Sequence, residues 1–283
     1  PESISHVLSD NELIAIPKGH SDIRPIGIGS TLRKLAALVI MRRLNSFNNE
    51  HFKNLQFGMQ CNGMEHIILE SRLRKEISPD VDLFCMDADN AFNRANRIVG
   101  LREVKEHIPE ALPFLREMYL HSSNGWYKHP QSDDIFNVSS KNGYHQGDVL
   151  ASWLFNMTLQ PILEHVHEKI SALGRENNVF VERDFFMGFY IDDGNIIAPR
   201  KLMIPLIQLL SNVGPKVGFH IKPTKGSYLM AKGLPGTNAL ADKEELCELL
   251  HLSPSVVHVH PDDCLASAHE YGVKILGSYL GSD

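Results

Sequence analysis

The sequence predicts an α+β fold, in which helices with one apolar face alternate with short apolar strands. Apolar residues recur at helical spacing from Leu32 to Leu44, and a longer apolar face of the same period runs from Leu150 to Ile170. Two segments have the composition of strands: the apolar stretch from Val81 to Met86 and a hairpin-like segment from Phe185 to Ile197. Together these segments favour a sheet that packs on helices.

The bulk composition is that of an ordinary globular protein. The chain has 283 residues, enough for two compact lobes or one large domain, and it is 43% hydrophobic and 22% charged. Its net charge of −6 gives no sign of nucleic-acid binding, so such a site would have to be a local basic patch. The segment from Ile16 to Arg43 is a candidate, with six basic residues and one acidic residue: Lys18, Arg24, Arg33, Lys34, Arg42 and Arg43 against Asp22.

The cysteines and the apolar runs narrow the class of protein further. Four cysteines lie far apart and form no Cys-x-x-Cys pair, which fits a reducing compartment and disfavours zinc ribbons and disulfide frameworks. No apolar run approaches the length of a membrane span, and no signal peptide is evident, so we expect an intracellular protein without a membrane partner. The chain begins with proline, and we expect it to be a segment of a longer protein.

The first helix should begin at Ser30 or Thr31, because both side chains can accept a hydrogen bond from a free backbone N–H group. Its apolar residues from Leu32 to Leu44 are expected to face the core. Arg33 and Lys34 lie mostly off that stripe. They either face solvent or contact the backbone of a nucleic-acid strand.

The later elements are delimited by residues that start or stop a helix. A helix at about 64–77 ends at Ser78-Pro79, Pro109 begins another, and Asp148 caps the long helix. The other expected elements are helices at about 94–107, 110–120, 201–213 and 242–250, a hairpin at 126–138, and strands near 218–225 and 272–277.

Three aspartates stand where strands end. Asp87 follows the apolar stretch that ends at Met86, and Asp192 and Asp193 lie at the tip of the predicted hairpin, where Asp193-Gly194 favours a tight turn. Such a turn lifts both carboxylates to the sheet edge, where a divalent cation can neutralise them. If the segment from Phe189 to Gly194 is considered alone, a solvated Asp-Asp turn is the alternative. Asp87 and Asp192 are far apart in the sequence, so only the fold can bring them together.

The order of the motifs resembles that of reverse transcriptases, specifically the branch of non-LTR retrotransposons and group II introns. The resemblance covers nearly the whole chain, from about residue 14 to the end. Arg24 to Leu44 is similar to the opening fingers segment, Asp87 to Asn93 to motif A, and His145 to Phe155 to motif B. Tyr190 to Asp193 is similar to motif C, Gly218 to Lys225 to motif D, and Val273 to Gly277 to motif E, the primer grip.

This resemblance implies a right-hand polymerase architecture with fingers and palm, in which an antiparallel palm sheet packs on helices and the thumb is absent or truncated. The fingers would comprise residues 1–80, with 96–150 returning to them. The palm would comprise residues 81–95 and 151–283 and would end at the primer-grip motif.

The resemblance also assigns the aspartates to metal binding. Asp87 and Asp192 would be the principal ligands and Asp193 a secondary one, for two Mg²⁺ ions, with Mn²⁺ possible. Phosphoryl transfer requires neutralised charge and in-line geometry more than covalent help from the protein. Two cations roughly 3.5–4 Å apart can bridge the attacking and leaving oxygens. Asp89 lies off the matching position and is expected to cap the following turn.

Five further residues receive roles from the family or from their chemistry. Phe92 would lie under the sugar of the incoming nucleotide and exclude a 2′-hydroxyl, and Gln146 would contact that nucleotide or the template base near it. Lys225 would act as general acid toward pyrophosphate, with an ordinary exposed lysine as the alternative. Lys18 and Arg24 would grip the triphosphate, or would belong to an exposed basic loop.

The expected function is RNA-directed DNA synthesis by a retroelement protein. The partners would be an RNA template, a DNA or RNA primer, deoxynucleotides and other domains of a longer polyprotein. The cellular site would be the nucleus or cytoplasm, and the nucleus for a eukaryotic non-LTR element. Two alternatives stay open: an RNA-dependent RNA polymerase, which Phe92 disfavours, and a retired polymerase fold kept as an RNA-binding scaffold, which the intact aspartates disfavour.

Overall fold

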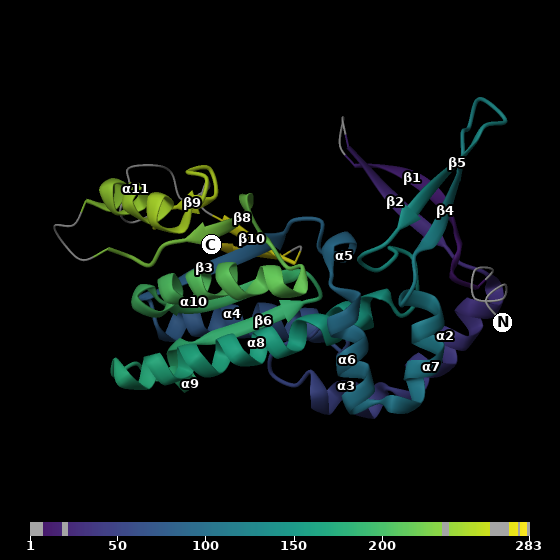
Figure 1. Cartoon of the computed structure of the whole chain (residues 1–283). Coiled ribbons are helices and arrows are strands. Elements are labelled where there is room, and N and C mark those ends of the chain that lie inside the picture. Colours follow the sequence, from purple (N-terminus) through teal and green to yellow (C-terminus); the bar gives the residue numbers. More distant parts are fainter. Residues whose placement is uncertain (1–7, 19–21, 234–237, 261–271, 277, 282–283) are drawn as a thin grey trace. The chain divides into compact units, whose positions relative to one another are not determined.

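The computed structural model describes residues 8–18, 22–233, 238–260, 272–276 and 278–281 (Figure 1). The chain forms two compact units. Unit 1 comprises residues 1–51, 90–159 and 216–219, and unit 2 comprises residues 52–89, 160–215 and 220–283. Residues 52–80 thus belong with the strand that carries Asp87, and the identification of the units as fingers and palm stays a prediction.

The sheet of unit 1 is made of two hairpins joined side by side. Strands β1 and β2 pair antiparallel, β1 runs parallel to β4, and β4 pairs antiparallel with β5, which gives the order β2-β1-β4-β5 (Figure 1). The hairpin predicted at 126–138 is therefore confirmed. The strands are β1 (Asn11–Lys18), β2 (Asp22–Ile28), β4 (Ser123–Lys128) and β5 (Ile135–Ser140).

The helices of unit 1 are close to their predicted positions. Ser30 caps the first helix by accepting a hydrogen bond from the N–H of Arg33, as the sequence predicts. The helices and short 3-10 turn are α2 (Thr31–Arg43), α3 (Asn45–His51), α5 (Ala91–Arg94), α6 (Arg97–His107), η1 (Pro109–Ala111) and α7 (Leu112–Tyr119).

The orientation of α2 contradicts the sequence prediction. Leu32 and Leu35 are exposed to 72% and 56%, whereas Arg33 on the other face is buried. Arg33 forms an ion pair with Asp148 and donates hydrogen bonds to the Ser9 carbonyl oxygen at 3.1 Å. A guanidinium fully supplied with acceptors can be buried, and the apolar period alone does not reveal such acceptors. Arg33 is therefore removed from the predicted basic surface.

Unit 2 contains the larger sheet, with strand order β6-β7-β3-β8-β9. The first four strands are antiparallel to their neighbours, and the short β9 runs parallel to β8. Figure 1 shows β3 (blue) next to β8 (green), although the two strands are far apart in the sequence. The strands are β3 (Val81–Ala88), β6 (Phe186–Tyr190), β7 (Asp193–Pro199), β8 (Ile221–Leu229) and β9 (Val257–His258).

Helices α4 and α10 pack against this sheet and bury its apolar residues. The core cluster includes Phe57, Ile67, Leu83, Ile197 and Leu229. Every helix among the described residues is too short or too polar to span a bilayer. The other elements of unit 2 are α4 (Gly63–Ile77), α9 (Val181–Asp184), α10 (Arg200–Val213), α11 (Ala239–Leu250), β10 (Gly272–Ile275) and β11 (Ser278–Gly281).

Two elements have residues in both units. The long helix α8 (Ala151–Glu176) follows the predicted capping residue Asp148, whose carboxylate accepts a hydrogen bond from the N–H of Leu150. The 3-10 turn η2 (Gly214–Val217) precedes β8. In the predicted strand and turn near the end of the chain, Gly277 falls outside the described residues.

Candidate functional site

Strand pairing in unit 2 brings the predicted aspartates to one end of the sheet. In the antiparallel pair β3–β7, Met86 lies opposite Gly194. Continuing this register by one residue sets Asp87 opposite Asp193. Asp192 directly precedes Asp193 in the hairpin turn, because Tyr190 pairs with Asp193 across β6 and β7. Directly opposed residues of neighbouring strands are roughly 5 Å apart, so the sheet brings the three aspartates close together.

The hairpin turn itself differs from the prediction. The turn residues are Ile191 and Asp192, and Asp193 already belongs to β7, so the expected Asp193-Gly194 turn is wrong. Ile191 adopts φ +62°, a left-handed conformation that is strained for a β-branched side chain. Gly58 allows this turn, because a Cβ there would come within 2.6 Å of the Ile191 side chain. Strain of this kind concentrates at functional sites.

Electrostatics at this end of the sheet is dominated by negative charge. Desolvation by burial, followed by the charges of Asp192 and Asp87, raises the pKa of Asp193 to about 6. The residue as a whole is exposed, and its carboxylate has the charges of Asp192 and Asp87 as neighbours. The shift means that the three carboxylates repel one another at neutral pH, and a bound cation would relieve that repulsion.

Lys225 is the fourth predicted residue of this group. Its Nζ atom lies 3.6 Å from Oδ2 of Asp87, where β8 pairs with β3. Gly226, next to it, has φ +98°, and a Cβ there would come within 2.3 Å of the Cys85 carbonyl oxygen. Only glycine fits at position 226, where the pairing of β8 with β3 is irregular. This irregularity sets Lys225 beside the carboxylates.

Asp89, expected to cap a turn, also has a cationic neighbour. Asn90 occupies the capping position of α5 and makes no side-chain capping bond. Asp89 lies 3.8 Å from Nζ of Lys222. The capping role of Asp89 stays a prediction, and β8 contributes a second lysine to the acidic end of the sheet.

The donor set fits a hard divalent cation. Carboxylate oxygens are the ligands that Mg²⁺ and Mn²⁺ prefer, and Mg²⁺ sites need few protein ligands because water and phosphate supply the rest. Asp87 and Asp192 are both partly exposed, so their oxygens are accessible to an ion from solvent. The raised pKa of Asp193 is the observation that speaks for a cation here.

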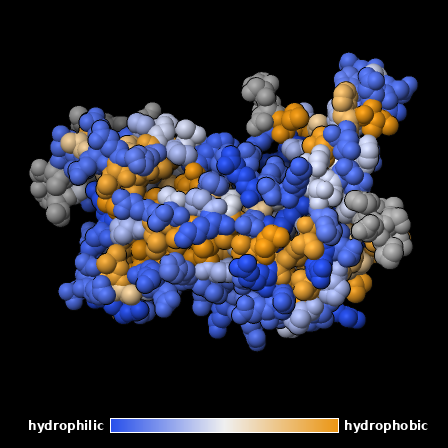
Figure 2. Space-filling model, in the orientation of Figure 1, coloured by the Kyte–Doolittle hydropathy of each residue, from blue (hydrophilic) through white to orange (hydrophobic). Residues whose placement is uncertain are grey.

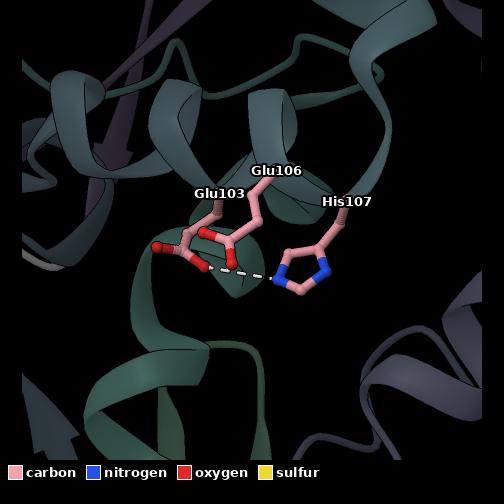
Figure 3. Close-up of side chains that lie close together, drawn as sticks. All are labelled: Glu103, Glu106 and His107. Atoms are coloured by element: carbon pink, nitrogen blue, oxygen red, sulfur yellow. Dashed lines mark ion pairs between the residues drawn. The ribbon is translucent and has the colours of Figure 1, made fainter.

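A different cluster has the tightest metal-ligand geometry among the described residues. Glu103, Glu106 and His107 project from α6 toward one another (Figure 3), and their ligand atoms all lie within 4.8 Å of each other. His107 Nε2 lies 3.6 Å from Glu103 Oε2, which is an ion pair when the histidine is protonated. The three aspartates of unit 2 are more widely spaced. Sequence reasoning did not single out this cluster, which belongs to unit 1.

Lys18 and Arg24 lie in the β1–β2 hairpin of unit 1. Ile16 pairs with Arg24 and Lys18 pairs with Asp22, so the two cationic residues share one face of the hairpin. Both side chains are exposed. Exposed cationic groups on one face can contact an anionic ligand from solvent.

Gln146 lines a cavity of about 420 Å³ over the sheet of unit 1. Leu13, Gly27 and Gly125 contribute to the same cavity, and Asn93 lies at it as well. The Gln146 carbonyl oxygen of the main chain accepts a hydrogen bond from Gly27 at 2.7 Å, which fixes the loop against β2. Its side-chain Oε1 is buried and has no hydrogen-bond partner among the described residues. A ligand that donates a hydrogen bond would satisfy this atom.

Phe92 is at the start of α5 and is half-buried. Its ring stacks on Phe155 of α8 with centroids 5.2 Å apart and an interplanar angle of 17°. The Phe92 carbonyl oxygen also fixes the loop before α8, since it accepts a hydrogen bond from the N–H of Tyr144 at 2.7 Å. The ring is thus held in one orientation, with part of its surface accessible.

Sequence reasoning missed a buried network near the start of β3, at the other end of the strand from Asp87. Asp82 in β3 is fully buried and accepts hydrogen bonds from the Tyr228 hydroxyl and the Ala231 N–H, each at 2.6 Å. Arg200 at the start of α10 completes the network at 3.1 Å. One signal was available: Asp82 interrupts an otherwise apolar strand. This network fixes β3 to β8 and α10, and so fixes the strand that carries Asp87.

Comparison with known proteins identifies the family. The family model described as "Reverse transcriptase (RNA-dependent DNA polymerase)" matches residues 16–280. This chain therefore belongs to the reverse transcriptase family. Comparison with curated protein sequences gives no match.

Solved structures with a similar fold include telomerases of two yeasts. Telomerase from Candida albicans, solved with the TWJ fragment of telomeric RNA, has a TM-score of 0.60 and 13% identity over 84% of this chain and 45% of that one. Apo telomerase from Candida tropicalis, truncated from its C-terminal domain, has a TM-score of 0.57 and 10% identity over 82% and 52%. At this identity the likeness establishes the fold alone. The present chain spans about half the length of these telomerase chains.

Proposed function

We propose that this chain is the RNA-directed DNA polymerase domain of a retroelement in the branch of non-LTR retrotransposons and group II introns. The observation that supports this most is the convergence of Asp87, Asp192 and Asp193 at one end of the unit 2 sheet in a member of the reverse transcriptase family. The substrates would be an RNA template, a DNA or RNA primer and deoxynucleotides. Further domains of a longer polyprotein would be its partners.

The three aspartates would hold the metal ions. Two Mg²⁺ ions, with Mn²⁺ as a substitute, supply charge neutralisation for the attacking and leaving oxygens when bound. Asp87 and Asp192 would be the principal ligands, and Asp193 would join them once its proton is lost. Lys225, whose Nζ lies 3.6 Å from Asp87, would donate a proton to the leaving pyrophosphate.

The residues of unit 1 would bind the nucleotide. Lys18 and Arg24 are exposed cations on one face of a hairpin, and they would bind the triphosphate. Gln146 would offer its buried Oε1 to a hydrogen-bond donor of the nucleotide or of the template base. Phe92, held by Phe155, would exclude a 2′-hydroxyl.

Primer extension on an RNA template with deoxynucleotides and Mg²⁺ tests the proposal. Asp192→Asn should reduce the extension rate by at least about a thousandfold, because a metal ligand contributes several kcal/mol of transition-state stabilisation. Asp80→Asn, at an exposed residue before β3, is the matched control and should extend normally. Normal extension by the Asp192→Asn variant would refute the metal assignment.

The nucleotide pool separates the proposal from the alternative of RNA synthesis. Extension should need deoxynucleotides, and Phe92→Ala should admit ribonucleotides more readily because the ring no longer occupies the space of a 2′-hydroxyl. Unchanged sugar discrimination would refute the role of Phe92. RNA binding without extension by the unaltered chain would favour the scaffold alternative.

A further inference from the structure

Strand β5 is an edge strand that lacks the usual protection. It stands at one end of the order β2-β1-β4-β5, so one side of its backbone has no strand partner among the described residues. Its first five residues are exposed, with Ile135 at 64%, Phe136 at 52% and Val138 at 53%. Figure 2 shows hydrophobic residues at the surface of the β4–β5 hairpin, at the upper right. The strand contains neither a charged residue nor proline.

The opposite edge of the same sheet is protected. Strand β2 carries Asp22, Arg24 and Pro25, and charges and proline are the features by which natural edge strands avoid pairing. Exposed apolar edge strands without such features pair with a further strand. The contrast within one sheet marks β5 as the edge that takes a partner.

The residues that flank β5 indicate which partner. Asp133 and Asp134 precede the strand and Lys141 follows it, so its two ends carry opposite charges. A two-fold axis through Asn137 sets Phe136 opposite Val138 of the second copy. The same register sets Asp133 opposite Lys141, and symmetry repeats both pairings. Aromatic and β-branched residues are favourable cross-strand partners, and opposite charges add to them.

We propose that β5 pairs antiparallel with β5 of a second copy of this chain, which joins two four-stranded sheets into one of eight strands. An isologous interface must be self-complementary, and β5 with its flanks meets that condition. The assembly stops at a dimer, since the protected β2 edges lie at both ends. This inference does not depend on the polymerase function.

The competing contact of Asp133 is weak. Its carboxylate lies 3.5 Å from Nζ of Lys128, but both side chains are well exposed. Such pairs contribute little because solvent screens them. Asp133 can therefore leave Lys128 and form an ion pair with Lys141 of a second copy instead.

Sedimentation velocity of the 283-residue chain over a range of concentrations tests the proposal. We expect a reversible dimer that Phe136→Lys abolishes, because a lysine there would face Val138 across the axis. Leu69→Lys, at an exposed leucine of α4, is the control and should leave the dimer intact. A monomer at every concentration, or a dimer that tolerates Phe136→Lys, overturns the proposal.

A charge exchange tests the two-fold register itself. Asp133→Lys or Lys141→Asp alone should raise the dimer dissociation constant roughly fivefold or more, since each breaks two symmetric pairs. The double variant Asp133→Lys/Lys141→Asp restores both pairs and should recover the dimer. Failure to recover overturns antiparallel pairing of β5.

Hydrogen exchange provides a readout that needs no variant. The backbone amides of β5 should exchange more slowly as the dimer forms, while those of β2 should not change. If β5 becomes protected only when a different protein is added, the partner is not a second copy, and the two-fold proposal fails.

Discussion

Strands β3 and β5 both contain valine and phenylalanine, which favour strands, yet one is among the most buried elements and the other among the most exposed. From Val81 to Met86, β3 is buried at every position except Cys85. In β5, the five residues from Ile135 to Ser139 are exposed. The difference comes from neighbours: β3 lies between β7 and β8 with helices packed on its sheet, whereas β5 is the last strand of its sheet.

The charges are distributed against expectation. The buried strand β3 contains Asp82, fully enclosed, while the exposed strand β5 contains no charge. Burial of a carboxylate is tolerated where Arg200, Tyr228 and a backbone N–H surround it. In unit 1 the equivalent burial of Arg33 depends on Asp148. In both units, therefore, we expect the largest loss of stability when a buried charged residue is replaced.

The largest loss of stability is expected from Arg33→Met in unit 1. The variant leaves the carboxylate of Asp148 buried without its cation and removes hydrogen bonds to Tyr119 and to Ser9. The free energy of unfolding should fall by about 3–5 kcal/mol. Urea denaturation measures this, with exposed Arg42→Met as a control expected to change stability by less than about 0.5 kcal/mol.

Asp82→Ala is the matching test in unit 2. The Arg200 guanidinium is about one-third exposed and keeps part of its hydration, so the loss should be somewhat smaller, about 3 kcal/mol. The same denaturation experiment measures it, and Asp80→Ala, two residues earlier and exposed, is the control. If Asp82→Ala and Asp80→Ala have the same free energy of unfolding, the buried network does not stabilise β3.

The acidic end of the unit 2 sheet should respond to pH. The pKa of Asp193 is raised to about 6, so the folded protein retains this proton more tightly than the unfolded chain. Its contribution to stability is complete below the ordinary pKa near 3.8 and is lost as the pH rises through 6. Binding of Mn²⁺ requires the carboxylate, so the affinity should increase between pH 5 and 7.

Calorimetric titration with Mn²⁺ measures this pH dependence. The Asp193→Asn variant is the reference, because it cannot lose a proton at this position and should show a flatter profile. An unaltered slope in the variant would mean that another group releases the proton.

The smallest effect is expected on the outer face of α2. Leu35 is exposed, so Leu35→Gln should change the free energy of unfolding by less than about 0.5 kcal/mol. Ala37 is buried, and Ala37→Leu should cost about 1–3 kcal/mol through overpacking. Thermal or urea unfolding of the two variants checks the observed orientation of α2. A larger loss of stability in Leu35→Gln than in Ala37→Leu would mean that the apolar face predicted from the sequence is the buried one.

Local sequence signals were enough to locate most elements. Ser30 as a cap, Pro109 at a helix start and Asp148 before a long helix all act within a few residues, and the structure contains each of them where it was predicted. The apolar strand before Asp87 and the hairpin around Asp192 follow from equally local patterns. The candidate carboxylates were therefore named from the sequence.

The tertiary structure decided what those local patterns leave open. The helical period placed Leu32 and Leu35 inside, but Arg33 is buried because distant Asp148 supplies its counter-charge. The turn at Ile191-Asp192, rather than at Asp193-Gly194, depends on packing against Gly58. Asp82 and Arg200 are far apart in the chain, and β5 is an edge because no further strand of the part that the structure describes pairs with it. Sequence alone located most of the helices and strands and showed which residues carry charge, because those properties are local. Burial, pairing and pKa depend on residues distant in the chain, so only the folded structure could decide them.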